Sequence, residues 1–550
     1  MQYTLGIMHT NDHIYDYIVI GSGFGGSVSA LRLAEKGYSV LVLEKGKRWQ
    51  GQDFPRINWQ LSKYLWVPAL RWFGFQRLSF FREVMVISGV GVGGGSIVYA
   101  NTHIRPPDAF YSNPRWAAFN NWKEVLRPFY DLANRMLGSA VYTPEYVEDR
   151  LLKEVAEEMG RGHTYGPVEG VGIYLGSPQQ AVDPYFEGLG PLRTGCTHCA
   201  GCMVGCRHDA KNTLDKNYLW LAEQHFGARI VPETQAERID YSDGLYTVTC
   251  HSSTARWRRP RQRYRSRGLV VSAGVLGTMD LLLRQKYQFS SLPGLSDRLG
   301  ENLMTNSEML SGVLAAREKL NHGIAISRVF APDEQTNVEI VKFPDGSGLM
   351  ARLGAMAAGP GSPPLRTLKM LWNSIRHPLD FLRVVFNRQL ATTGVFFLIM
   401  QTLDNAMRMQ LGRGLLGRRL RMVNDGPERV PTFIPKGQEA MLRYARKAGG
   451  VPQNAITEIT LNLATTAHIL GGCPMGSDAD AGVVDPRFRV HGYPDMYILD
   501  GSIIPCNLGV NPSLTITALS EYAMSLVPAK PGHEGLSLEA RMAAQRSQQV

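Results

Sequence analysis

The chain has 550 residues, too many for a single hydrophobic core, so we expect at least two domains. Its composition, with 44% hydrophobic and 19% charged residues, excludes an intrinsically disordered protein. The net charge of +11 suits an anionic partner surface. No long Lys/Arg block is interleaved with aromatic residues, however, so we expect no nucleic-acid partner.

The sequence shows no pattern of a targeting or membrane-spanning segment. The first strand-like run begins at Tyr15, without a basic and then apolar leader before it. The apolar run GVFFLIM at 394–400 is far shorter than the ~18–20 residues that span a bilayer. We therefore expect a cytoplasmic location, where cysteines stay reduced.

A βαβ unit with a dinucleotide-binding pattern occupies residues 15–46. The β-branched and aromatic run YDYIVI predicts a buried strand, and a helix and a second strand, YSVLVLE, follow it. Gly21, Gly23 and Gly26 form G-x-G-x-x-G, which allows a tight turn, close approach to a pyrophosphate, and close packing of helix and strand. Glu44 ends the second strand, where an acid binds a ribose hydroxyl.

Two further glycine-containing elements follow in the chain. Residues 88–102 read SGVGVGGGSIVYANT, and so many glycines suit backbone that lies flat against a large planar ligand. Residues 269–282, LVVSAGVLGTMDLL, predict an apolar strand, a turn at Gly274 and a helix. This third element looks like another backbone contact with a dinucleotide.

These elements, in this order, resemble the glucose-methanol-choline (GMC) family of FAD oxidoreductases, and within it the bacterial cholesterol oxidases of the mycobacterial type. The C-terminal block agrees, with TTAHILGGCPMG at 465–476 and GYPDMYILDGSIIPCNLGVNPSLTITALSEYA at 492–523. The resemblance spans roughly residues 15–527. It implies an α/β chain (α+β overall) with a Rossmann-like FAD-binding domain. It also implies a discontinuous substrate domain on a mainly antiparallel sheet.

The motifs and the resemblance together predict the residues that contact FAD. They are Gly21, Gly23, Phe24, Gly25, Gly26, Glu44, Gly91, Gly93, Gly94, Gly95, Ser96, Ala236, Ala273, Gly274, Asp500, Gly501, Asn511 and Pro512.

The resemblance also implies the residues beside the flavin ring, His468 and Asn511. Alcohol oxidation needs a group that takes or orders the hydroxyl proton, and histidine does so near neutral pH. Asn511 and Pro512 read as the N-cap and first residue of a helix over 513–518, whose positive end would face the flavin.

A glutamate serves the related sterol oxidases as a base, also for moving the steroid double bond. The matching position is Glu339, within the strand-like run Thr336–Val341. The alternative is a solvated glutamate on the outer face of this strand. In that case oxidation would persist without the isomerisation.

Two segments rich in Trp, Phe and Leu also carry Lys and Arg, at 57–81 and 363–391. They are either amphipathic surfaces that contact a membrane peripherally, or ordinary lids and core helices of the substrate domain. Both interpretations favour a bulky apolar alcohol, such as a sterol, over a sugar.

Four of the seven cysteines lie within GCTHCAGCMVGCRHDAKNTLDKNYLW at 195–220. Cys196, Cys199, Cys202 and Cys206 have the C-x2-C-x2-C-x3-C spacing of bacterial ferredoxins, although the residue after the last cysteine is arginine rather than proline. The loop is followed by a predicted helix and strand, so it is part of the FAD domain and not a separate module.

Three alternatives stay open for this loop. It holds a [4Fe–4S] cluster, with Cys206 or the remote Cys473 or Cys506 as the fourth ligand, or a zinc ion, or no metal. A cluster would pass electrons to a carrier, as in a dehydrogenase. Flavin alone would pass them to O2, as in an oxidase.

The predicted organisation interleaves the two domains. The FAD-binding domain takes 1–50, 82–105, 195–315 and 455–527, the substrate domain and its lid take 51–81, 106–194 and 316–454, and a mobile tail takes 528–550. The favoured function is FAD-dependent oxidation of the 3β-hydroxyl of a sterol. The alternatives are a dehydrogenase for long-chain or terpenoid alcohols and a non-catalytic electron-transfer flavoprotein.

Overall fold

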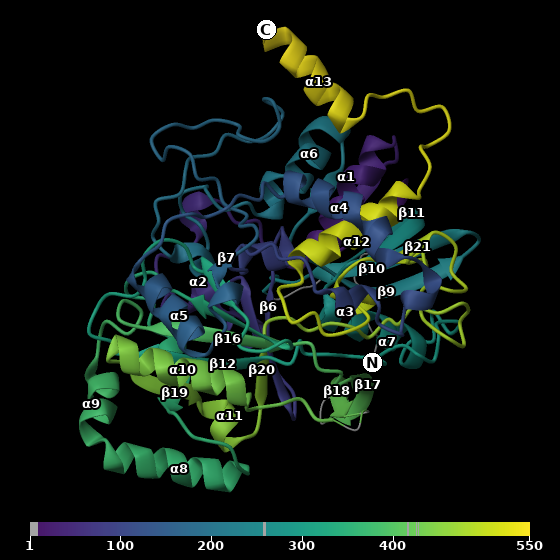
Figure 1. The fold of residues 1–550 in the computed structure, drawn as a ribbon. Helices are drawn as coiled ribbons and strands as arrows, with labels where there is room; N and C mark the ends of the chain where they lie inside the picture. The colour runs from purple at the N-terminus through teal and green to yellow at the C-terminus, as the bar shows by residue number, and fades with distance from the viewer. Residues whose placement is uncertain (1–8, 257–259, 415–416, 425, 427, 550) are drawn as a thin grey trace.

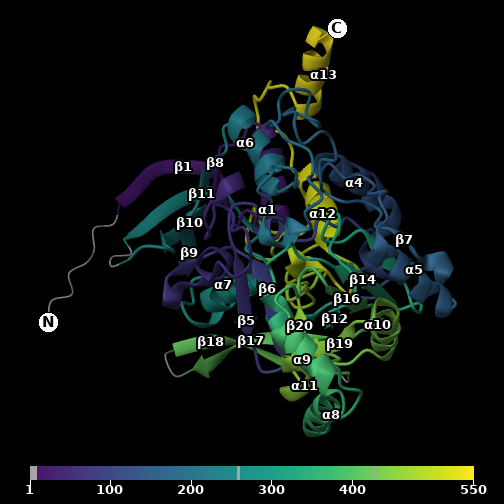
Figure 2. The same ribbon diagram turned by 90° about the vertical axis from the view of Figure 1, so that its left-hand side faces the viewer.

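The computed structural model describes residues 9–256, 260–414, 417–424, 426 and 428–549. Figures 1 and 2 show two large sheets placed one above the other, with helices on their outer sides. The helices are α1 (Phe24–Glu35), α2 (Leu61–Tyr64), α3 (Asp108–Tyr111), α4 (Trp122–Met136), α5 (Val147–Glu158), α6 (Tyr218–Phe226), α7 (Val275–Tyr287), α8 (Pro363–Arg376), α9 (Pro378–Phe386), α10 (Pro435–Ala448), α11 (Ile456–Thr460), α12 (Ser513–Ser525) and α13 (Leu538–Gln549).

The first sheet is the Rossmann-like sheet that the N-terminal pattern predicts. Its order among the described residues is β8-β2-β1-β11-β10-β9, with β21 also beside β11. Strands β8, β2, β1, β11 and β21 run parallel, and β9 and β10 are antiparallel additions. The strands are β1 (His9–Ile20), β2 (Val40–Leu43), β8 (Arg229–Val231), β9 (Thr234–Ser242), β10 (Leu245–Ser252), β11 (Arg261–Val271) and β21 (Met496–Ile498).

Strand β11 divides the first sheet. Its residues 261–266 pair with β10, whereas Leu269–Val271 pair with Met496–Ile498 of β21, and β1 flanks its other side. The C-terminal block therefore lies beside the N-terminal βαβ unit. The carboxyl ends of β1, β11 and β21 meet at one edge, the position where open parallel sheets bind ligands.

The second sheet has the order β15-β19-β12-β16-β14-β13-β7, and its neighbours are antiparallel, as predicted. Helices α5 and α10 cover one of its faces through a core that includes Val155, Phe397 and Tyr444 (Figure 1). The strands are β7 (Gly166–Pro167), β12 (Met309–Leu314), β13 (Arg328–Phe330), β14 (Thr336–Val341), β15 (Gly354–Met356), β16 (Val395–Gln401) and β19 (Val451–Ala455).

Smaller sheets complete the fold. One has the order β20-β6-β5, with β20 parallel to β6, and it contributes to the region between the large sheets. The others are the pairs β3–β4 and β17–β18. The strands are β3 (Trp66–Val67), β4 (Trp72–Phe73), β5 (Gln76–Phe80), β6 (Val84–Gly89), β17 (Met407–Gly414), β18 (Gly417–Asn424) and β20 (Ala464–Thr466).

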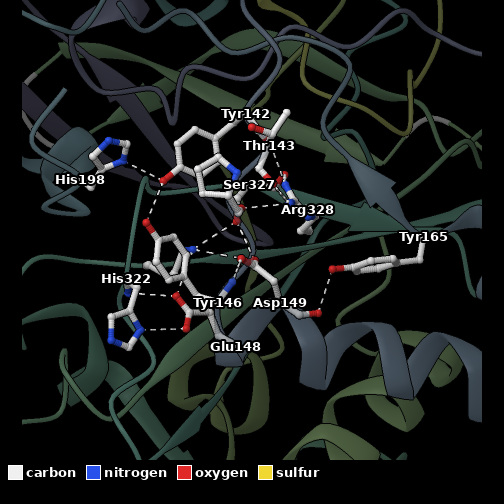
Figure 3. Close-up of polar contacts among 12 residues, drawn as sticks. Tyr142, Thr143, Tyr146, Glu148, Asp149, Tyr165, His198, His322, Ser327 and Arg328 are labelled. Carbon is white, nitrogen blue, oxygen red and sulfur yellow. Dashed lines mark hydrogen bonds and ion pairs between the residues drawn. The ribbon is translucent and has the colours of Figure 1, made fainter. Parts of the chain in front are cut away.

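A buried group of charged side chains joins the start of α5 to the second sheet (Figure 3). Lys342 Nζ lies 3.3 Å from Glu148 Oε1, and both side chains are fully buried. His322 Nδ1 lies 3.1 Å from the other Glu148 oxygen, and Arg328 donates to the backbone carbonyls of residues 142–144. Breaking such a buried pair costs about 3–5 kcal/mol, so this group fixes α5 on the sheet.

Two features differ from the predicted organisation. Strand β12 belongs to the second sheet, although the division placed 195–315 in the FAD domain; the other boundaries stay a prediction. The chain after α12 is also attached in part, because Lys530 Nζ lies 2.6 Å from Asp16 and Leu538 is buried, while α13 projects outward (Figures 1 and 2). In the part of the chain that the structure describes, no helix is long and apolar enough to cross a bilayer.

Candidate active site

Two adjoining cavities lie at the carboxyl edge of the first sheet. The larger, of about 940 Å³, is lined by the turn after β1, by Glu44 after β2 and by Ala236 on β9. The smaller, of about 270 Å³, extends toward the second sheet. Gly23, Ala273 and Gly274 line both cavities, so the two together form one elongated site.

Two of the three glycines of the first turn pack closely against backbone, and the third borders open space. Gly21 has a φ of +95°, and a Cβ on it would lie 2.2 Å from the Ser272 carbonyl oxygen. A Cβ on Gly26 would lie 2.0 Å from the Gly21 oxygen. A Cβ on Gly23 would meet no described atom within 4 Å, so its backbone borders the open cavity. This matches the three roles that the G-x-G-x-x-G pattern assigns.

Most residues predicted to contact FAD line the two cavities. They are Gly21, Gly23, Phe24, Glu44, Gly94, Gly95, Ala236, Ala273, Gly274, Asp500, Gly501, Asn511 and Pro512.

Gly25, Gly26, Gly91, Gly93 and Ser96 do not line either cavity. A Cβ on Gly25 would lie 1.7 Å from a backbone oxygen of the first sheet's edge, so this glycine allows close packing. The Ser96 hydroxyl donates to the Gly93 carbonyl, 2.6 Å away. These residues shape the loops that carry the lining residues.

His468 faces the smaller cavity and is held from behind by a buried carboxylate. Its Nδ1 donates to Glu308, and the Ala467 backbone N–H donates to the other Glu308 oxygen at 2.7 Å. Burial by itself lowers the pKa of His468, but the Glu308 charge and hydrogen bond outweigh it and raise the pKa overall. Because Nδ1 is occupied, Nε2 is the ring nitrogen left to meet a bound alcohol.

Asn511 and Glu339 form a second buried pair. The Asn511 Nδ2 donates to Glu339 Oε2 at 3.4 Å. Glu339 is fully buried on β14, which excludes the alternative of a solvated strand glutamate. Burial raises its pKa to about 7.

The position of Glu339 on its strand aims it toward the smaller cavity. Its cross-strand partner Leu398 and the residue two positions along, Val341, share its face of the sheet, and both line that cavity. Among the described residues, Glu339 Oε1 and Asn511 Oδ1 are buried without a hydrogen-bond partner. Two side chains that bond each other thus each keep an unpaired acceptor; among the described residues Asn511 lines the smaller cavity and Glu339 does not.

The helix after Asn511 begins at Ser513, within the predicted range, but its N-cap is Pro512 and not Asn511. Helix α12 starts at Ser513 with Pro512 before it, and no side-chain cap bonds its first turn. Asn511 is not the N-cap because its amide is turned toward Glu339. The first turn still meets the cavity, since Pro512, Ser513 and Ile516 line it.

Sequence analysis missed two residues behind the site, Glu308 and Asn306. Asn306 Oδ1 accepts from the backbone N–H groups of Leu508 and Gly509, each at 2.9 Å, and its Nδ2 donates to the Val510 carbonyl. It thus holds the loop that leads to Asn511. In the sequence, Glu308 and Asn306 are marked just by a short polar run before the apolar strand β12. No sequence spacing relates the two residues to their partners, which lie some 160 to 200 residues away.

The ferredoxin-like loop forms a site of its own. Cys196, Cys199, Cys202 and Cys206 line one cavity of about 180 Å³, whereas Cys473 and Cys506 do not line it.

Hydrogen bonds from three neighbouring segments hold the loop in place. The Ala200 N–H donates to the Gly323 carbonyl at 2.8 Å, and His198 Nδ1 lies 2.8 Å from the Tyr142 hydroxyl (Figure 3). Arg207, where ferredoxins have proline, donates to the Phe54 carbonyl. Within the described ranges, no three His, Cys, Asp or Glu side chains converge as ligands of one metal ion.

This cysteine cavity shares a wall with the smaller cavity of the active site. Met203 lines the active-site cavity, and the adjacent Cys202 lines the cysteine cavity. Lys211 Nζ lies between them and donates to the carbonyls of Ile97, Tyr99 and Cys202 at 2.7–2.9 Å. Burial lowers the pKa of Lys211 to about 7.

Comparison with protein families agrees with the geometry of the site. Models of the GMC oxidoreductase family match residues 192–307 and 419–520. A model of an NAD(P)-binding Rossmann-like domain matches residues 19–52, which hold the first glycine turn.

Relatives extend this similarity over the whole chain. A cholesterol oxidase of Acinetobacter baumannii is 40% identical over 95% of this chain and 96% of its own length. A cholesterol oxidase of Mycobacterium tuberculosis is 43% identical over 94% of this chain and 91% of its own. A long-chain-alcohol oxidase of Arabidopsis thaliana is 24% identical over 95% of this chain and 69% of its own. The chain therefore belongs to the GMC oxidoreductase family, and it is an FAD-dependent alcohol oxidoreductase.

Solved structures share the fold. The crystal structure of pyridoxine 4-oxidase from Mesorbium loti superposes with a TM-score of 0.59 at 15% identity, covering 93% of this chain and 99% of that one. A fungal aryl-alcohol oxidase gives a TM-score of 0.53, also at 15% identity, covering 93% of this chain and 98% of that one.

The Glu308–His468 pair predicts a measurable change in titration. Glu308→Gln removes the charge that raises the pKa of His468, so the imidazole should lose its proton at a lower pH than in the wild type. NMR titration of histidine-labelled protein measures this directly. Glu318→Gln, at an exposed position, is the matched control and should leave the titration of His468 unchanged. An unaltered pKa in Glu308→Gln would contradict the assigned role of the pair.

Proposed function

We propose that this protein oxidises the 3β-hydroxyl group of a sterol to the ketone, with FAD as its cofactor. Two findings support the substrate class. Relatives that carry the name cholesterol oxidase align over nearly the full chain at 40–43% identity. The smaller cavity, where the flavin ring would meet the reacting end of the substrate, is also largely apolar, with His468 and Asn511 as a polar end suited to a single hydroxyl group.

The lining residues fit FAD. The open backbone at Gly23 and the N-terminus of α1 suit the pyrophosphate, and Glu44 on the larger cavity suits the ribose. We propose that the ring system occupies the smaller cavity beside Gly95, Gly501 and Pro512. When bound, FAD accepts the hydride that leaves the carbinol carbon.

His468 orders the hydroxyl group of the substrate in this proposal. Its Nδ1 is fixed by Glu308, so Nε2 meets the alcohol oxygen, and the pair holds the ring in one orientation. Loss of the hydride and of the hydroxyl proton leaves the ketone, so the hydroxyl proton must pass to a base at this end of the cavity.

The unpaired acceptors of Glu339 and Asn511 are the observation that carries the proposal. A buried acceptor without a partner costs about 1–3 kcal/mol, and a substrate hydroxyl satisfies it. With a pKa near 7, Glu339 is a base at neutral pH. In this proposal the same carboxylate would also move a proton along the steroid ring when the double bond isomerises.

Substrate reduction of the flavin tests the proposed reaction. Under anaerobic conditions we expect cholesterol to bleach the flavin absorbance of the purified enzyme, and a long-chain alcohol to bleach it far more slowly. His468→Asn should lower kcat by about 10²–10⁴-fold while FAD content stays unchanged. Faster bleaching by the long-chain alcohol would replace the sterol assignment, and no bleaching by either would overturn the enzyme assignment.

The pKa of Glu339 predicts the pH profile. Glu339 acts only in its ionised form and its pKa is about 7, so kcat/KM of the wild type should rise as pH increases through that value. Glu339→Gln should flatten this rise and release the unconjugated ketone instead of its isomer. Glu334→Gln, an exposed neighbour before β14, is the control and should keep both properties. An unchanged profile in Glu339→Gln would exclude it as the base.

We also propose that the cysteine loop binds a [4Fe–4S] cluster. Two observations support a cluster. The four thiols line one cavity, which adjoins the cavity proposed for the flavin ring, and they have the ferredoxin spacing. The thiols must come closer together than they lie without metal, because no three of them converge in the described chain. A cluster here would provide an exit for electrons to a carrier, whereas without one O2 takes them.

Metal analysis of anaerobically purified protein tests the cluster. We expect about four iron and four sulfide per chain, and Cys202→Ser should lose both while it keeps FAD. Cys250→Ser, at a buried thiol outside the loop, should lose neither. Zinc in place of iron, or no metal, would overturn the proposal, and the second result would favour a flavin oxidase that uses O2.

A further inference from the structure

The two segments rich in aromatic and basic residues differ in how they are folded and how far they are buried. The first, 57–81, is divided: Tyr64, Trp66 and Phe75 are buried, whereas Trp59, Leu70 and Phe80 are exposed, so neither alternative holds for the whole segment. The second forms α8 and α9, which lie on the outside of the second sheet, at the end of the molecule opposite α13 (Figures 1 and 2). In this second segment the exposed apolar side chains are more numerous and follow a helical spacing.

Helix α8 exposes one continuous apolar face. Leu368, Leu371, Trp372 and Ile375 follow the i, i+3, i+4, i+7 spacing that places side chains on one side of a helix. All four are exposed, and Ile375 reaches 71%. An amphipathic helix of a globular protein normally buries such a face.

Helix α9 follows α8 at a steep angle (Figure 1) and exposes apolar side chains of its own. Leu379, Leu382 and Phe386 are again spaced by three and four residues, and Leu379 and Phe386 are 76% and 74% exposed. Helices α8 and α9 together (363–386) are called the α8–α9 hairpin. The side of the hairpin opposite to these exposed residues packs on the sheet through Met370 and Val384. The outer face of α8 and α9 is therefore not needed to hold the helices in place.

Polar side chains fix the hairpin from within. Arg366 is buried and donates to the Thr432 and Glu458 carbonyls. Arg352 donates to the carbonyls of Val384 and Val385 at the end of α9. The hairpin is thus a rigid element whose outer apolar face is held toward solvent.

The charged residues beside the exposed apolar side chains of α8 and α9 are mostly basic. Arg376, the last residue of α8, and Arg388, two residues after α9, are exposed, and Lys369 on α8 is half-buried. The acid of the hairpin, Asp380, forms an ion pair with Arg383. Basic side chains of this kind attract anionic lipid headgroups.

We propose that the outer face of α8 and α9 docks the enzyme on an anionic phospholipid bilayer. The apolar side chains enter the acyl boundary while Arg376 and Arg388 contact headgroup phosphates. A second copy of the chain is the weaker fit, because the same face on a partner carries the same basic residues and its acid, Asp380, is already paired with Arg383. The docking proposal is argued from this surface and does not depend on the proposed reaction. If the substrate is a sterol, docking would bring the enzyme to the bilayer in which the sterol is dissolved.

Vesicle binding by the full-length protein tests the docking surface. We expect the wild type to co-sediment with sterol-free vesicles of phosphatidylcholine and phosphatidylglycerol, and to bind less at high salt or without phosphatidylglycerol. The double variant Trp372→Ser, Ile375→Ser should bind at least about tenfold more weakly. Leu192→Ser, at an equally exposed apolar residue outside the hairpin, is the control and should bind like the wild type.

Two results would overturn the proposal. One is equal vesicle binding by the hairpin variant and the wild type, or no binding by the wild type. The other is a wild-type dimer in solution that the variant loses, which would assign the face to a second copy. Activity on detergent-dispersed cholesterol should be unchanged in the variant, so failure of docking and failure of the proposed reaction are told apart.

Discussion

The burial of two carboxylates between the sheets is the constraint on which the active site depends. Glu339 lies on β14 of the second sheet and Glu308 directly before its strand β12, and an ionised carboxylate that is buried needs a partner. The partners, His468 and Asn511, come from the C-terminal segment that also contributes β21 to the first sheet. Pairing across this gap sets the position of the catalytic side chains relative to the cofactor cavity.

The cofactor side of the site depends on close approach of backbone. Strand β11 divides the first sheet so that β1, β11 and β21 end together, and the loops after them form the walls of both cavities. Gly21 and Gly26 occupy places where a side chain would collide with backbone, and only Gly23 borders open space. The same motif therefore serves packing at two positions and ligand approach at one.

Three regions of different chemistry surround this centre. The smaller cavity of the active site has a polar end at His468 and Asn511, the cysteine cavity lies behind a shared wall at Met203, and helices α8 and α9 present apolar side chains to the outside. The buried Lys211 joins the first two through three backbone carbonyls. An enzyme for a water-insoluble alcohol needs this separation, because the surface that collects the substrate is apolar whereas proton transfer needs buried polar groups.

Local pattern was enough to predict the βαβ unit, the strand over 336–341 and the glycine loops, because strand and helix periods and tight turns depend on neighbouring residues. The sequence also contained the side chains of the chemistry, His468, Asn511 and Glu339. It did not show that Glu339 is buried, that Asn511 turns away from its helix, or that Glu308 supports His468. Those facts depend on contacts between segments some 160 to 170 residues apart, which only the packing of the two sheets decides.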